Sequence, residues 1–210
     1  MEKLSDYIIE YPNTLKPEFC DHLIEKFEKD DRSIKGKVLL HGVKTETKRS
    51  TDLLISELSD WAEEDEVFYQ ALNTKLMSYS DTLGVGELIH SSQVIDSGYQ
   101  IQRTMAGEYY KWHHDCTGKY NNYEKYLYLR IYTYIFYLND NFKGGRTQFF
   151  PHLKEPYNII PEKGKLILFP ANTMWLHQGE TVEEGNKYLT TGWIYTQTSL
   201  ENQWNSSYFF

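Results

Sequence analysis

The chain has 210 residues, of which 40% are hydrophobic, 16% aromatic and 25% charged, and its formal net charge is -8. So many aromatic side chains argue against disorder, and the negative charge argues against nucleic acid as a partner. No run approaches the roughly 20 apolar residues of a membrane helix, and residues 1–6 lack the apolar core of a signal peptide. We therefore expect one soluble domain over residues 1–210, located in the cytoplasm, which would be the host cytoplasm for a viral protein.

The first part of the chain, about residues 1–90, is predicted to be helical support for a later core. Pro17 suits a first helical turn, and apolar residues then keep a helical spacing to about residue 29. A second helix is expected from about Asp60, which can cap it together with Glu63, to about Tyr79. Between these helices, the basic stretch 32–49 is either a solvated loop or a lid or surface for an acidic partner.

From about residue 93 the pattern changes to short β-branched and aromatic runs that are separated by turn residues. This pattern predicts antiparallel strands near 94–104, 108–115, 128–138, 146–151, 157–160, 165–169, 174–182 and 187–197. Such a series favours a mainly β fold with flanking helices. Its core, over about residues 93–197, would be a double-sheet jelly roll packed against the N-terminal helices. Cys20 and Cys116 lie far apart and match neither a disulfide framework nor a zinc-type spacing.

His113 and Asp115 are the first candidates for chemistry. Residues two apart on a strand point to the same face with Cα atoms about 6.6 Å apart, so both side chains can reach one ion while His114 faces away. The best third ligand is His177, because it is a polar side chain in an otherwise apolar stretch. Two histidines and one carboxylate on a barrel suit non-haem Fe(II) and oxygen chemistry. Taken one at a time, these residues are more often structural than metal ligands, so the prediction rests on the three together. His22, His41, His90 and His152 show no such pattern and are predicted to be structural.

Several motifs in chain order resemble the catalytic domain of prolyl 4-hydroxylases of the small microbial or viral type. They are Tyr110-x-x-His113-x-Asp115, Arg130-x-x-Thr133-x-x-x-Tyr137, Gly144-Gly145-Arg146-Thr147, His177, and then Lys187 and Trp193. The resemblance covers about residues 94–197. It implies a double-stranded β-helix, also called a jelly-roll or cupin-like fold, and an Fe(II)- and 2-oxoglutarate-dependent dioxygenase.

The resemblance also implies roles for individual residues. His113, Asp115 and His177 would hold the iron, and Lys187 would bind the far carboxylate of 2-oxoglutarate. Four further residues would complete the cosubstrate pocket: Tyr137, Thr147, Trp193 and Tyr110. The implied reaction hydroxylates prolyl residues of a peptide or protein, consumes O2, and releases succinate and CO2, with ascorbate as a further cofactor.

Two departures from the family pattern leave the substrate open. Arg146 stands where the family usually has an acidic residue, and Gln102-Arg103-Thr104 stands where many relatives have a tyrosine. The alternatives are the same chemistry on a free amino acid or small metabolite, or a non-catalytic β-helix module that binds a partner. The segment 116–126 is either a substrate loop or an ordinary surface loop. Nothing in the sequence sets the oligomeric state.

Overall fold

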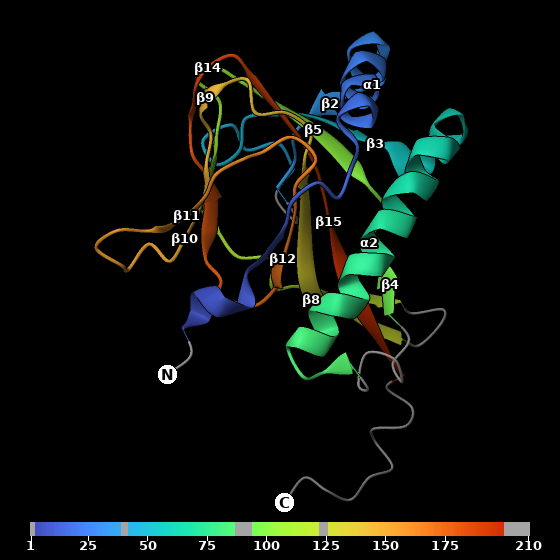
Figure 1. Cartoon of the computed structure of the whole chain (residues 1–210), viewed down its shortest axis with the longest axis vertical. Helices are drawn as coiled ribbons and strands as arrows, with labels where there is room; N and C mark the ends of the chain where they lie inside the picture. The colour runs from blue at the N-terminus through green and yellow to red at the C-terminus, as the bar shows by residue number, and fades with distance from the viewer. Residues whose placement is uncertain (1–2, 39–41, 87–93, 122–125, 200–210) are drawn as a thin grey trace, which may run out of the picture.

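The computed structural model describes residues 3–38, 42–86, 94–121 and 126–199, and its core is a pair of antiparallel sheets with two helices on the outer side of one of them (Figure 1). The large sheet runs in the order β1 (Ile9–Tyr11), β12 (Leu166–Pro170), β8 (Tyr126–Tyr137), β15 (Asn186–Ser199), β5 (Gln100–Met105), β3 (Thr51–Leu54) and β2 (Ile34–Lys35), with β4 (Val94–Asp96) on β15 and β7 (Gly118–Asn121) on β8.

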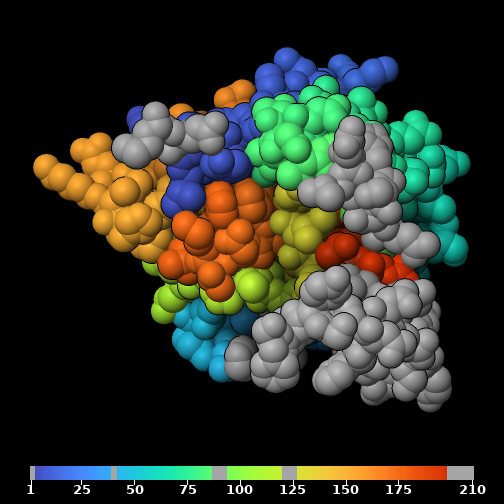
Figure 2. Space-filling view, turned by 90° about the horizontal axis from the view of Figure 1, so that it is seen from below, coloured from blue at the N-terminus to red at the C-terminus, as the bar shows by residue number. Residues whose placement is uncertain are grey.

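The second sheet has four short strands and faces the large one. Its order is β11 (Tyr157–Ile159), β10 (Thr147–Phe149), β13 (His177–Gly179) and β6 (Tyr110–His113). A small ladder of β9 (Lys143–Gly144) and β14 (Val182–Glu184) closes one end. The loop between β10 and β11 projects from the body of the molecule (Figure 2). This arrangement confirms the predicted mainly β, double-stranded β-helix fold.

Strand β8 separates two hydrophobic cores because its side chains alternate between the two faces of the sheet. Tyr134 and Phe136 pack in the cluster that contains the helices, whereas Ile135 and Tyr137 belong to a second cluster that includes residues of both sheets. Strand β12 alternates in the same way. The site described below lies on the inner face, so the helices support it without contributing its chemistry.

Both predicted helices are present as α1 (Pro17–Lys29) and α2 (Ala62–Thr82), and α2 lies along the large sheet (Figure 1). The predicted cap of α2 is wrong. A 3-10 turn (η3, Ser59–Trp61) precedes the helix, Trp61 occupies the capping position without a side-chain hydrogen bond, and the carboxylate of Asp60 binds Arg32 instead. Two further 3-10 turns are η1 (Leu4–Tyr7) and η2 (Ile55–Glu57).

Other predicted boundaries also need correction. The first 80 residues are not only helical, because β1, β2 and β3 join the large sheet. The predicted strand 94–104 is interrupted between β4 and β5, where Gly98 has φ +73°. The predicted strand 108–115 ends at His113, and β7 was not predicted.

Three further predictions concern undescribed segments, the two cysteines and membrane helices. His41, His90 and residues 122–125 of the segment 116–126 lie outside the described residues. Cys20 and Cys116 are both free cysteines. Among the described helices, none is both long and apolar enough to cross a membrane.

Candidate metal centre and its cavity

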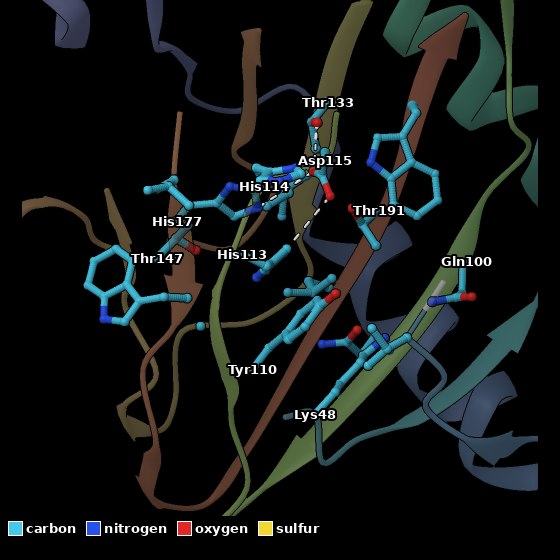
Figure 3. Close-up of a pocket in the computed structure, with 18 of the residues that line it drawn as sticks. Lys48, Gln100, Tyr110, His113, His114, Asp115, Thr133, Thr147, His177 and Thr191 are labelled. Atoms are coloured by element: carbon cyan, nitrogen blue, oxygen red, sulfur yellow. Dashed lines mark hydrogen bonds and ion pairs between the residues drawn. The ribbon is translucent and has the colours of Figure 1, made fainter. Parts of the chain in front are cut away.

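Three side chains that are distant in sequence converge on the inner face of the second sheet. His113 is the last residue of β6, His177 is the first residue of β13, and these two residues are paired across the strands. Asp115 follows two residues beyond the end of β6. The candidate ligand atoms of the three residues lie within 4.8 Å of one another (Figure 3). The predicted triad is therefore brought together, and His114 is exposed and outside it.

Backbone hydrogen bonds fix which nitrogen of each imidazole faces the centre. Nδ1 of His113 donates to the carbonyl of Lys111 at 2.7 Å, and Nδ1 of His177 donates to the carbonyl of Trp175 at 2.9 Å. Because a carbonyl oxygen only accepts, each Nδ1 must carry the proton, which leaves each Nε2 with a free lone pair. Both Nε2 atoms face Asp115, at 3.9 Å from Oδ1 for His113 and 3.5 Å from Oδ2 for His177.

Asp115 is held in its ionised form. It is 7% exposed, and its Oδ2 accepts a hydrogen bond of 2.8 Å from the hydroxyl of Thr133. Burial favours the protonated acid, but the neighbouring imidazoles and this hydrogen bond outweigh it, so the pKa of Asp115 lies below its ordinary value. Burial also lowers the pKa of His113 and so favours the neutral imidazole. Neutral imidazoles and a carboxylate are the forms that ligate a metal.

The donor set fits Fe(II). Two imidazole nitrogens and one carboxylate that leave open coordination positions are typical of non-haem Fe(II) oxygenases. Structural zinc sites use four ligands and mostly include cysteine, and no Cys belongs to this cluster of described residues.

A buried cation lies in the same cavity. Lys187 is 3% exposed, and its Nζ donates to the carbonyl of Gly145 at 2.5 Å. Among the described residues it forms no ion pair. Burial lowers the pKa of Lys187 to about 7, with the Glu180 carboxylate acting in the opposite direction. Since a buried ammonium without an anion is costly, this lysine fits the distal carboxylate of a dicarboxylic oxoacid.

Two further predicted residues, Tyr137 and Thr147, lie near this lysine. The hydroxyl of Tyr137 donates to Oγ1 of Thr147 at 2.6 Å, and both side chains are buried. Nζ of Lys187 lies 5.5 Å from the centre of the Tyr137 ring. Burial raises the pKa of Tyr137, so its hydroxyl stays protonated. Tyr137 donates to Thr147, so the Thr147 hydroxyl keeps its own proton for a ligand.

Tyr110 connects the metal centre to a buried ion pair that sequence reasoning missed. Its ring stacks on His113 at a centroid distance of 3.6 Å, and Lys48 lies on the other side, 5.3 Å from the ring centre (Figure 3). Lys48 donates to Asp52 at 2.7 Å, and Ser50 and Gln100 donate to the same carboxylate. The only sequence signal for this ion pair was the basic composition of residues 32–49, which did not indicate Asp52 as the partner of Lys48.

The cavity between these walls has a volume of about 510 Å³, which is in the usual range for a small-molecule site. Trp193 and Arg130 line it, and the guanidinium of Arg130 lies 3.4 Å from the centre of the Trp193 ring. Lys37 and Val38 of the basic segment also line the cavity. This part of the segment is therefore a cavity wall. All eight predicted site residues surround this one space: Tyr110, His113, Asp115, Thr147, His177, Lys187 and Trp193 line it directly, while Tyr137 reaches it through Thr147.

Comparison with known proteins agrees with this geometry. Residues 99–195 match the family described as the 2OG-Fe(II) oxygenase superfamily. This stretch includes the metal triad, Tyr137, Lys187 and Trp193. The predicted resemblance to prolyl 4-hydroxylase-like oxygenases is therefore confirmed, through a match that covers a little under half of the chain.

A curated relative from Acanthamoeba polyphaga mimivirus, provisionally named a prolyl 4-hydroxylase, is 28% identical over 107 residues. That alignment covers 45% of this chain and 43% of the relative, so the match spans less than half the length of either protein.

Two solved structures are similar in fold. A prolyl hydroxylase from Trichoplax adhaerens, solved with a peptide fragment of the hypoxia inducible factor oxygen degradation domain, has a TM-score of 0.71 at 15% identity. The comparison covers 97% of this chain and 89% of that one. The viral collagen prolyl hydroxylase of Paramecium Bursaria Chlorella virus-1, in complex with 2OG, has a TM-score of 0.62 at 23% identity. That comparison covers 90% of this chain and 95% of the viral one.

Proposed function

We propose that the chain is a single Fe(II)- and 2-oxoglutarate-dependent dioxygenase domain that hydroxylates prolyl residues of a peptide or protein. The observation that carries this proposal is the pairing of the His113, Asp115 and His177 cluster with the buried Lys187 in one cavity. The prolyl hydroxylases among its relatives and structural neighbours support the choice of substrate, including one solved with a peptide.

The residues divide the work between two ends of the cavity. Nε2 of each histidine and the Asp115 carboxylate would hold the iron, while Lys187 and the Thr147 hydroxyl would bind the distal carboxylate of 2-oxoglutarate. When bound, iron and 2-oxoglutarate would supply, together with O2, an oxidising chemistry that places one oxygen atom in a C–H bond and the other in succinate, with release of CO2. Ascorbate would keep the iron reduced.

The protein's contribution is orientation and exclusion of water. Apolar side chains on the inner face, such as Ile135 and Leu189, line the cavity between the two ends. Tyr110 packs flat against His113 and limits the rotation of that ligand. Trp193 and Arg130 lie on the wall opposite the short sheet, where a substrate C–H bond could approach the metal.

A mass-spectrometric assay tests this function. The protein, Fe(II), 2-oxoglutarate and ascorbate are incubated with a panel of proline-containing peptides, and in parallel with free amino acids. The expected result is one added oxygen atom on a prolyl residue, with succinate formed in equal amount and no product from the His177→Ala variant. Oxygen added to a free amino acid instead would identify the small-molecule alternative. No succinate with any substrate would favour the non-catalytic binding module.

A further inference from the structure

Arg146 and Glu180 face each other at the end of the cavity that holds Lys187. Gly144 pairs with Val182 and Thr147 pairs with Gly179, and between these pairs the amide of Glu180 donates to the carbonyl of Arg146 at 2.9 Å. The two side chains therefore leave neighbouring backbone positions. Lys187 contacts the same strip of chain, because its Nζ donates to the carbonyl of the residue just before Arg146.

The Arg146 guanidinium holds the Glu180 carboxylate with two hydrogen bonds. Nε donates to Oε2 and Nη2 donates to Oε1, each at 2.8 Å, which is the paired geometry in which arginine binds carboxylates best. Arg146 also keeps the pKa of Glu180 below its ordinary value, so the carboxylate stays charged. Glu180 lines the cavity, whereas Arg146, with its side chain 46% exposed, holds it from outside.

Glu180 is positioned to compete with a ligand for Lys187. Asp115 and Glu180 are the two acidic residues among the described residues that line the cavity, and Asp115 is already held by Thr133 between the two histidines. A dicarboxylate that enters the cavity therefore meets one further carboxylate near its anchoring lysine. An unpaired Glu180 would either bind Lys187 or repel the incoming anion.

We propose that Arg146 is a specificity-determining residue for the oxoacid cosubstrate: it binds Glu180 and so leaves Lys187 free for the distal carboxylate of the ligand. This inference rests on the proposed function, since it requires that a dicarboxylic oxoacid bind beside the metal. The pair acts on the distal end of the ligand and leaves metal binding unchanged. Its effect therefore depends on whether the ligand carries a distal carboxylate.

The test is a calorimetric titration of 2-oxoglutarate into the Fe(II)-loaded protein without oxygen. Arg146→Ala should weaken binding by roughly 5- to 20-fold, the range expected for one uncompensated charge near a partly buried site. Glu180→Gln should leave the affinity equal or higher, and Arg146→Ala combined with Glu180→Gln should return it to within about twofold of the wild type. If the pair only tied the strands together, both single variants would weaken binding, so weakening in Arg146→Ala alone identifies the electrostatic role.

The matched control ligand is 2-oxobutyrate, which has the same metal-binding end but no distal carboxylate. Its affinity should change by less than about twofold in Arg146→Ala, because 2-oxobutyrate lacks the distal carboxylate that an unpaired Glu180 would repel. Arg146→Gln serves in place of Arg146→Ala if that variant does not fold.

Two results would overturn the inference while leaving the proposed function standing. One is unchanged 2-oxoglutarate affinity in Arg146→Ala, and the other is equal weakening in both single variants without recovery in the double variant. Wild-type protein that binds Fe(II) but no 2-oxoglutarate would overturn the proposed function, and the inference with it.

Discussion

His177 lies directly opposite His113 in the pairing of β13 with β6, and the centres of their imidazole rings are 4.2 Å apart. The candidate metal centre is thus built on hydrogen-bonded backbone on both sides, with Asp115 supplied from just beyond the strand end. Because only three side chains would hold the metal, we expect substitution of any one of them to weaken metal binding.

Removal of either histidine should abolish the reaction. In His113→Ala or His177→Ala, two ligands remain, and we expect Fe(II) binding in an anaerobic titration and 2-oxoglutarate-dependent succinate formation to fall below detection. His152→Ala is the control, because His152 is exposed and outside the cluster, and it should behave as wild type. Retained turnover in both ligand variants, with trace metals removed, would contradict the assignment.

Thr133→Val should weaken the metal site without dismantling it. The substitution preserves shape but removes the hydrogen bond that orients Asp115. Loss of such a supporting contact typically costs about 10- to 100-fold in metal affinity. The measurement is a competition titration with a chelator. Thr191→Val, which alters a hydroxyl bonded to the backbone of Tyr134, is the matched control and should leave the metal affinity unchanged.

The affinity for 2-oxoglutarate should fall as the pH rises above about 7. With its pKa lowered to about 7, Lys187 loses its proton above that pH, and a neutral amine binds a carboxylate weakly. Binding near pH 8 should therefore take up a proton, which calorimetry in buffers of different ionisation enthalpy detects. Lys187→Arg should take up no proton, because an arginine side chain stays charged at this pH. Equal proton uptake in both proteins would contradict the prediction.

The same lysine links the stability of the unliganded protein to pH. Its folded-state pKa lies below the ordinary value of 10.5, so the folded protein binds fewer protons than the unfolded chain between about pH 7 and pH 10. Stability should therefore rise with pH in this window relative to Lys187→Met. Urea unfolding of both proteins at several pH values measures the difference.

Lys48→Met should destabilise the protein strongly. Both members of the Lys48 and Asp52 pair have side chains only 5% exposed, and loss of the lysine leaves a buried carboxylate without its counter-ion. The expected cost is about 3–5 kcal/mol in the free energy of unfolding. Lys48→Met combined with Asp52→Leu should recover part of that loss, since no charge is then buried. If the double variant is as unstable as the single one, charge burial is not the cause.

The sequence was most informative where chemistry constrains single positions. The residue types and spacing of His113, Asp115 and His177 pointed to one metal site, and the structure brings them together. The strand near 128–138 was also predicted and is found as β8, because a run of β-branched and aromatic residues reflects local propensity. These features need no knowledge of which strands become neighbours.

Features that depend on long-range pairing escaped prediction. Strands β1, β2 and β3 are short, so their local pattern is weak. β1 is held by β12 and β3 by β5, both distant in the chain, and β2 joins the sheet through β3. The contact of Lys48 with Tyr110 arises for the same reason, through a bridge between the basic segment and β6. The cap of α2 was misjudged because Asp60 is bound by Arg32, a tertiary contact that local propensity does not include.

The two-sided packing of β8 limits how this strand can change length. A single residue inserted before Thr133 would shift one half of the strand by one position. In that half, tyrosines that pack against the helices would then face the cavity, and cavity-facing residues would face the helices. Two added residues would restore the facing and shift only the register. Strand β8 should therefore tolerate substitutions but hardly any insertion or deletion of an odd number of residues. Length variation among related sequences is expected instead in the projecting β10–β11 loop.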